Sequence, residues 1–136
     1  MKKYIKYLII ASTILVSACG DSEFNRRAAK YGFNTEEERY FLCFGMGVYN
    51  DNMEIRLAAA ATGIAYSRYL QKQRTGYDSR KLTPEHSALQ ARGYKVWERM
   101  DPADIQYLSK ECVPVVQKLL PKMATELQDS KAMLGL

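Results

Sequence analysis

The chain has 136 residues, of which 47% are hydrophobic and 26% charged, so it holds one globular domain and is neither collagen-like nor low in complexity. Its 20 basic and 15 acidic side chains give a formal charge of +5. Three of the lysines, Lys2, Lys3 and Lys6, lie in an N-terminal segment without acidic residues. The remaining chain is nearly neutral and lacks the dense positive face that phosphate backbones require, which argues against a nucleic acid partner.

The N-terminal segment has the layout of an export signal. The three lysines form its positive region, and residues 8–16 form an apolar run. The uncharged stretch over residues 7–18 is shorter than the roughly 20 residues that cross a bilayer as a helix. The segment therefore predicts export rather than a permanent transmembrane helix.

The segment ends in an aliphatic pair, two small residues and a cysteine, Leu15-Val16-Ser17-Ala18-Cys19. This pattern resembles the lipobox of bacterial lipoproteins. The resemblance implies cleavage of residues 1–18, a diacylglyceryl thioether on the Cys19 sulfur, and a new acylated N-terminus, which together anchor a protein stably. Gly20 follows the cysteine in place of the aspartate that retains enteric lipoproteins in the inner membrane. The resemblance thus implies the outer membrane, with the domain facing the periplasm; an ordinary secretory signal with an incidental cysteine is the alternative.

Two cysteines remain, Cys43 and Cys112. An even number of cysteines in an oxidising compartment predicts a disulfide, and a bridged loop of about 70 residues contributes roughly 4 kcal/mol of stability. Neither cysteine belongs to a C-x-x-C motif. Cys43 and Met46 have a spacing that soft metals can use, but no histidine cluster accompanies them. We therefore expect a structural bridge and no metal or other cofactor.

Helical signals dominate the rest of the chain. Residues 19–34 are expected to form a lipidated tether, with Arg26 and Arg27 in solvent or against anionic head groups. Thr35 and Glu38 form a capping box that starts a helix expected to run to Tyr49. Four further segments have helical apolar spacing or helix-start residues: residues 53–73, 84–100, 102–119 and 121 onward.

These segments predict an all-α fold for residues 35–136. We expect a small, antiparallel bundle of about four helices, with Cys43 in the first helix bridged to Cys112 in the fourth. Gly45 and Gly47 are expected to let another helix approach closely. Pro114 is expected to kink or end the fourth helix near Val113.

No catalytic motif is apparent. His86 is the single histidine and is expected at the surface, in the first turn of a helix. Its neighbour Ser87 points in another direction, no serine lies in a G-x-S-x-G elbow, and the usual zinc ligands are missing. We expect no enzymatic activity; an envelope hydrolase would need His86 or a pair of carboxylates in a cleft.

A partner protein is the leading functional expectation. The loop around residues 75–81 places a tyrosine among basic residues, and Arg74, Tyr77, Arg80 and Lys81 are its predicted partner-binding residues; a purely solvated loop is the alternative. The tyrosines in the exported chain suit protein interfaces, and they suit a small helical core nearly as well. The sequence thus predicts a lipid-anchored, non-enzymatic module that binds another envelope or periplasmic protein.

Two other functions remain open. The small size, helical pattern and cysteine pair are similar to the exported helical immunity proteins that protect against amidase effectors of type six secretion. That resemblance implies a periplasmic toxin as partner. Alternatively, a lipid or haem-like ligand could lie between the helices, lined by Phe41, Phe44, Tyr66 and Trp97, although these side chains suit a core equally well.

Overall fold

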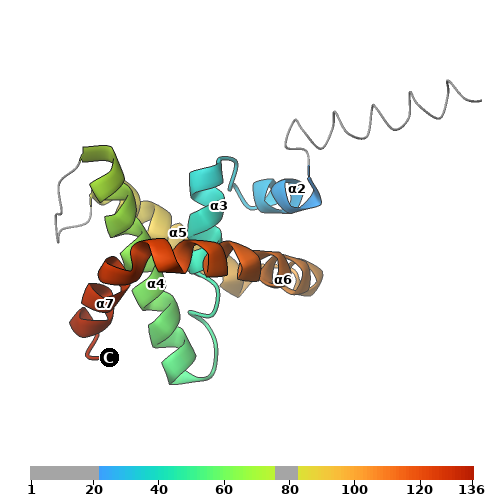
Figure 1. Cartoon of the computed structure of the whole chain (residues 1–136). Coiled ribbons are helices and arrows are strands. Elements are labelled where there is room, and N and C mark those ends of the chain that lie inside the picture. The colour runs from blue at the N-terminus through green and yellow to red at the C-terminus, as the bar shows by residue number, and fades with distance from the viewer. Residues whose placement is uncertain (1–21, 76–82) are drawn as a thin grey trace, which may run out of the picture.

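The computed structural model describes residues 22–75 and 83–136. Within these ranges every regular element is a helix (Figure 1): α2 (Glu23–Lys30), α3 (Glu36–Phe44), α4 (Met53–Thr75), α5 (Pro84–Arg99), α6 (Pro102–Leu119), the 3-10 helix η1 (Leu120–Met123) and α7 (Ala124–Met133). The predicted all-α fold is confirmed. The signal segment and Cys19 lie outside the described residues. No helix within the described ranges is both long and apolar enough to cross a membrane.

Helix α3 is the centre of the fold and contacts α2, α4, α5 and α6. The predicted capping box forms at its start: the Glu38 N–H donates to the Thr35 hydroxyl, and the Thr35 N–H donates to the Glu38 carboxylate, each over 3.1 Å. The helix ends at Phe44, so the predicted extension to Tyr49 is wrong. Gly47 has φ +95°, a left-handed conformation that glycine adopts without steric cost and that turns the chain towards α4.

Helices α3 and α5 cross with their backbones in contact. A Cβ atom on Gly45 would lie 2.1 Å from the Gly93 carbonyl oxygen, and one on Gly93 would lie 2.3 Å from the Phe41 carbonyl oxygen. Only residues without a side chain fit at this crossing. The close approach predicted at Gly45 is therefore confirmed, and Gly93 is its counterpart on the other helix.

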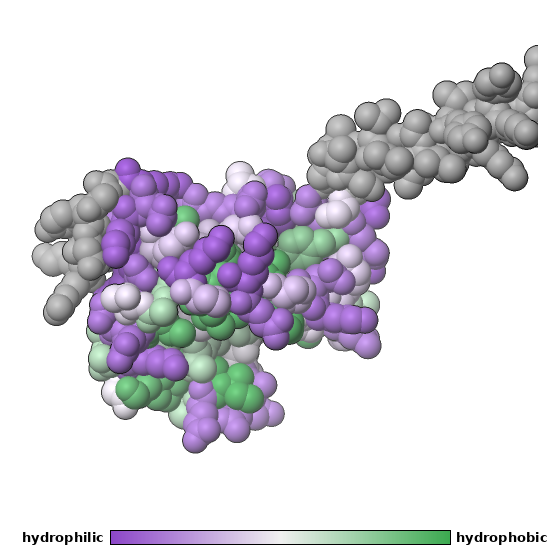
Figure 2. Space-filling model, in the orientation of Figure 1, coloured by the Kyte–Doolittle hydropathy of each residue, from purple (hydrophilic) through white to green (hydrophobic). Residues whose placement is uncertain are grey.

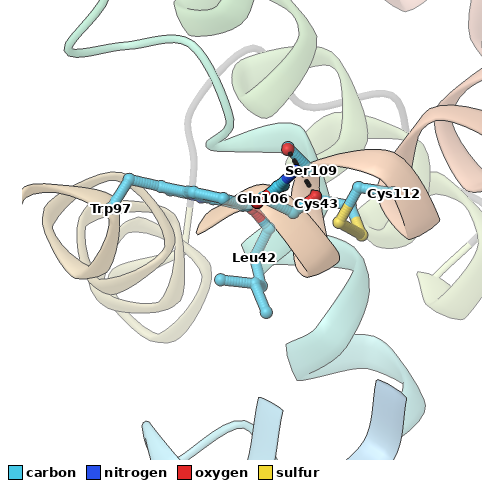
Figure 3. The surroundings of a disulfide bond; sticks show 6 residues. All are labelled: Leu42, Cys43, Trp97, Gln106, Ser109 and Cys112. Atoms are coloured by element: carbon cyan, nitrogen blue, oxygen red, sulfur yellow. Dashed lines mark hydrogen bonds between the residues drawn. A yellow bond between two sulfur atoms is a disulfide. The ribbon is translucent and has the colours of Figure 1, made fainter. Parts of the chain in front are cut away.

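The predicted disulfide is also confirmed. Cys43 and Cys112 join α3 to α6, with Cα atoms 5.0 Å apart. The bridge lies in a core cluster that contains Val96, Trp97 and Leu108. Trp97 extends from α5 beside the disulfide (Figure 3), and its indole N–H donates to a backbone carbonyl of α3 over 2.9 Å. The bridge and this hydrogen bond hold α6 and α5 against α3.

Helix α6 passes through Pro114 without ending and continues to Leu119. Of the two predicted outcomes, a kink or an end near Val113, the end is therefore wrong. Proline leaves the carbonyl four residues earlier without its helical donor, but Pro114 and Lys110 are both exposed, so water can satisfy that carbonyl. Figure 1 shows α4 crossing the line of η1 and α7, with which it is in contact, so these elements are not antiparallel neighbours.

Residues 23–33 belong to the folded domain, and the predicted tether over this stretch is wrong. Ser22 caps α2 by accepting a hydrogen bond from the Asn25 N–H. Ala28 and Phe33 are both buried in the core. The domain thus begins at α2 and not at residue 35, because this polar segment has partners far away in the sequence.

The chief partner of α2 is Asp104, in the first turn of α6. Its Oδ1 accepts from the Arg27 guanidinium over 2.9 Å, and its Oδ2 accepts from the Lys30 ammonium over 2.9 Å and the Tyr31 hydroxyl over 2.5 Å. The Asp104 side chain is only 7% exposed. The hydrogen bond from Tyr31, together with the Lys30 and Arg27 cations, lowers the pKa of Asp104.

Replacing Asp104 by asparagine should release α2 and lower the free energy of unfolding at pH 7 by about 2 kcal/mol, because three donors lose a charged acceptor. The folded-state pKa of Asp104 lies below its unfolded value. The contribution of the Asp104 carboxylate to the free energy of unfolding is therefore complete above its unfolded pKa of about 4. This contribution is lost as the pH falls through the folded pKa. Urea denaturation against pH, with amide hydrogen exchange in α2, measures both effects.

Asp101→Asn is the matched control. Asp101 pairs with Lys30 as well, but both side chains are more than half exposed, so its replacement should change stability by less than about 1 kcal/mol. Equal losses in the two variants, or unchanged exchange of the α2 amides in Asp104→Asn, would contradict this account of the docking of α2.

Candidate binding groove

A groove of about 500 Å³ runs between α3, α4 and the end of α6, within the volume range typical of ligand sites. Its lining residues are Glu36, Tyr40, Tyr66, Tyr69, Leu70, Pro114, Val115, Lys118, Leu119 and Lys122, and we call it the tyrosine groove. Figure 2 shows small hydrophobic areas enclosed by hydrophilic side chains over the middle of the molecule. The groove combines apolar walls with a charged rim.

The floor of the groove is aromatic and fixed in position. The Tyr66 side chain lies edge-on to Phe41, with ring centroids 4.8 Å apart, and is stacked on Phe44 at 4.9 Å. Tyr40 meets it edge-on at 5.9 Å. Burial raises the pKa of the Tyr66 hydroxyl, so this residue stays neutral. The Tyr66 ring is only 2% exposed, so it forms a fixed base beneath the partly exposed Tyr40 and Tyr69.

The rim carries charges of both signs. On one side the Tyr40 hydroxyl donates to the Glu36 carboxylate over 2.5 Å, and this hydrogen bond raises the pKa of Tyr40 to about 12. On the other side Lys118 and Lys122 are exposed, and neither ammonium has a carboxylate within 4.0 Å in the described part of the chain. The rim therefore offers two uncompensated positive charges next to apolar surface.

The predicted partner-binding loop is only partly described. Tyr77, Arg80 and Lys81 lie outside the described residues. Arg74, in the last turn of α4, donates to the Glu37 carboxylate over 2.5 Å and does not line the tyrosine groove. Its guanidinium is engaged within the domain, so a partner that used Arg74 would have to compete with Glu37.

His86 is buried, and its predicted surface position is wrong. Its side chain is 3% exposed, with Nε2 3.5 Å from a Glu37 carboxylate oxygen and its ring 6.1 Å from that of Phe41. The glycine crossing presses α5 onto α3, so the first turn of α5 faces its neighbour. Among the described residues no hydroxyl or thiol hydrogen-bonds to the imidazole ring.

The four aromatic residues considered for an apolar ligand do not share a pocket. Phe41 and Phe44 are each 1% exposed and Trp97 is 8% exposed, all within the core. Of the four, Tyr66, itself only 2% exposed, borders the groove, and Phe44 borders a separate, smaller pocket. All four side chains fill the core, which is the alternative that the sequence left open. In the described ranges no group of three or more histidine, cysteine, aspartate or glutamate side chains could hold a metal ion.

Among the groove residues, Tyr66 was a predicted ligand-lining residue, whereas Tyr40, Tyr69, Lys118 and Lys122 were not predicted as site residues. Tyr66 and Tyr69 are three positions apart in α4 and share one side of that helix, whereas Lys118 lies in the last turn of α6 and Lys122 in η1. The spacing of Tyr66 and Tyr69 predicts that the two rings lie on one side of α4, but it does not predict which other helix they contact.

No protein family, curated protein or solved structure matches this chain. The groove is therefore interpreted from its own chemistry.

Proposed function

We propose that this chain is a lipid-anchored protein of the bacterial envelope that faces the periplasm and binds another protein without catalysing a reaction. The tyrosine groove carries this proposal, because tyrosines around an apolar centre with a charged rim are typical of protein interfaces. Tyrosine rings supply large contact areas and retain a hydroxyl for hydrogen bonding.

The anchoring part of the proposal rests on the lipobox-like residues 15–20. Helix α2 begins at Glu23, so three residues separate Cys19 from the fold. Each residue spans at most about 3.6 Å, which would hold the domain directly at the membrane surface. A partner in the same membrane, or one that reaches it, would then meet the groove at a high local concentration.

Site-specific crosslinking in the native envelope tests this proposal. A photoreactive amino acid at Tyr69 of the full-length chain should crosslink one protein, whereas the same group at Glu98, exposed on α5, should not. Mass spectrometry of the adducts provides the measurement. A Cys19→Ser chain should no longer incorporate palmitate into the protein.

Two outcomes would count against the proposal. Identical adducts from Tyr69 and Glu98 would mean that the groove has no specific partner. Adducts with lipid alone from Tyr69 would favour the alternative, a carrier of small amphipathic molecules, which a groove of this volume could also hold.

A further inference from the structure

Building on the proposed function, we infer that the tyrosine groove binds an acidic segment of the partner protein that inserts one large apolar side chain between carboxylates. The inference rests on the unequal charge of the rim and on the shape and chemistry of the floor.

The positive side of the rim determines the charge of the ligand. Lys118 in the last turn of α6 and Lys122 in η1 lie four positions apart and border the same groove. Neither ammonium group has a carboxylate partner in the described part of the chain, so each can form an ion pair with a carboxylate of the ligand. Water is excluded when a ligand covers the groove, which strengthens such ion pairs relative to those on an open surface.

The negative side of the rim determines the orientation of the ligand. The Glu36 carboxylate repels acidic groups from the α3 side, and it already accepts the Tyr40 hydroxyl hydrogen bond. The acidic groups of a bound segment should therefore lie over Lys118 and Lys122, away from α3. A uniformly basic segment would be repelled by the positive charges of Lys118 and Lys122, so such a segment is disfavoured.

The floor determines the need for an apolar group. Tyr69 and Leu70 from α4 and Val115 and Leu119 from α6 all line the groove and are partly exposed. A purely acidic segment would leave these surfaces in water, whereas an aromatic or leucine side chain would cover them. The centre of the groove thus supplies apolar contact, and its rim selects the sign of the flanking charges.

Defined peptides test this chemistry with the acylated chain in phosphatidylcholine nanodiscs. The probes are a labelled Asp-Glu-Trp-Leu-Asp-Glu peptide, the same peptide with lysine at every acidic position, and the same peptide with alanine for Trp and Leu. Fluorescence anisotropy should show the tightest binding for the first peptide, with an affinity that falls as salt increases. Equal binding of the acidic and basic peptides, or no binding of the acidic one, would overturn the inference.

Variants of the two lysines locate the effect. Lys118→Glu with Lys122→Glu should weaken binding of the acidic peptide by roughly tenfold or more, and the double arginine variant should retain it. Lys95→Glu with Lys110→Glu is a matched control, because it changes net charge equally at exposed positions that do not line the groove. Equal losses in both glutamate variants would overturn the site and leave only a general effect of charge.

The crosslink from Tyr69 separates the two proposals. If the groove crosslinks a protein but Lys118→Glu with Lys122→Glu leaves the yield unchanged, the proposed function stands and the acidic-segment inference fails. If the acidic peptide binds as expected but Tyr69 crosslinks no protein in the envelope, the proposed function fails.

Discussion

Replacing Cys43 and Cys112 together by alanine should lower the free energy of unfolding by about 4 kcal/mol. The bridge joins residues 69 positions apart, and in the chain-entropy model a loop of this length strongly restricts the unfolded chain. Small domains have a total stability of about 5–15 kcal/mol, so the loss should take a large part of it. Urea denaturation of the disulfide-bonded natural sequence and of the double alanine variant measures the difference.

A reductant provides the control for this result. Dithiothreitol should destabilise the natural sequence by a similar amount and leave the double alanine variant unchanged. Both cysteines are no more than 1% exposed, so the bridge of the folded protein should be reduced slowly. A double variant as stable as the natural sequence would show that the fold does not depend on the bridge.

Replacing Gly93 by alanine should lower the free energy of unfolding by about 3 kcal/mol. This is the second large effect that we expect. In an unhindered helix the same change stabilises by about 1 kcal/mol. Here the new Cβ would lie 2.3 Å from a backbone oxygen of α3, and a backbone cannot move aside as a side chain can. The helices must separate, and such overpacking of a core is destabilising. Thermal and urea unfolding give the sign and size of the effect.

Gly63 in α4 offers a matched substitution. A Cβ at this position would approach the Tyr94 hydroxyl within 2.2 Å, at the end of a side chain that can turn away. Turning would break its hydrogen bond to the Ala60 carbonyl, so Gly63→Ala should cost about 1 kcal/mol. A Gly93→Ala protein as stable as Gly63→Ala would contradict a tight crossing of α3 and α5.

The sequence predicts a helix start correctly where the capping residue and the backbone group that it binds lie in one short stretch of chain. The Thr35 capping box needs only residues 35–38, and Thr83 caps α5 through the His86 N–H within three positions. The docking of α2 depends instead on distant groups. Asp104 meets Arg27 across 77 positions, a pairing that no helical period reveals.

The same distinction applies to the candidate site. The sequence predicts partner-binding residues in the loop beyond Arg74, because its charged residues and its tyrosine are adjacent along the chain. The tyrosine groove takes Tyr40 from α3, Tyr69 from α4 and Lys118 from α6, so it exists only after three helices have packed. His86 was misplaced for a related reason, since its burial follows from the glycine crossing and not from its own neighbours.

The disulfide also decides how the domain would carry mechanical load. A pull between the N-terminal end of α2 and Lys118 in α6 would pass along the chain to Cys43, across the sulfur–sulfur bond, and on from Cys112. Helices α4 and α5 lie in the covalent loop that this route bypasses. The contacts of α2 with Asp104, which lies in that loop, would yield first. After they break, the covalent route alone would bear the load and the loop between the cysteines would keep its fold.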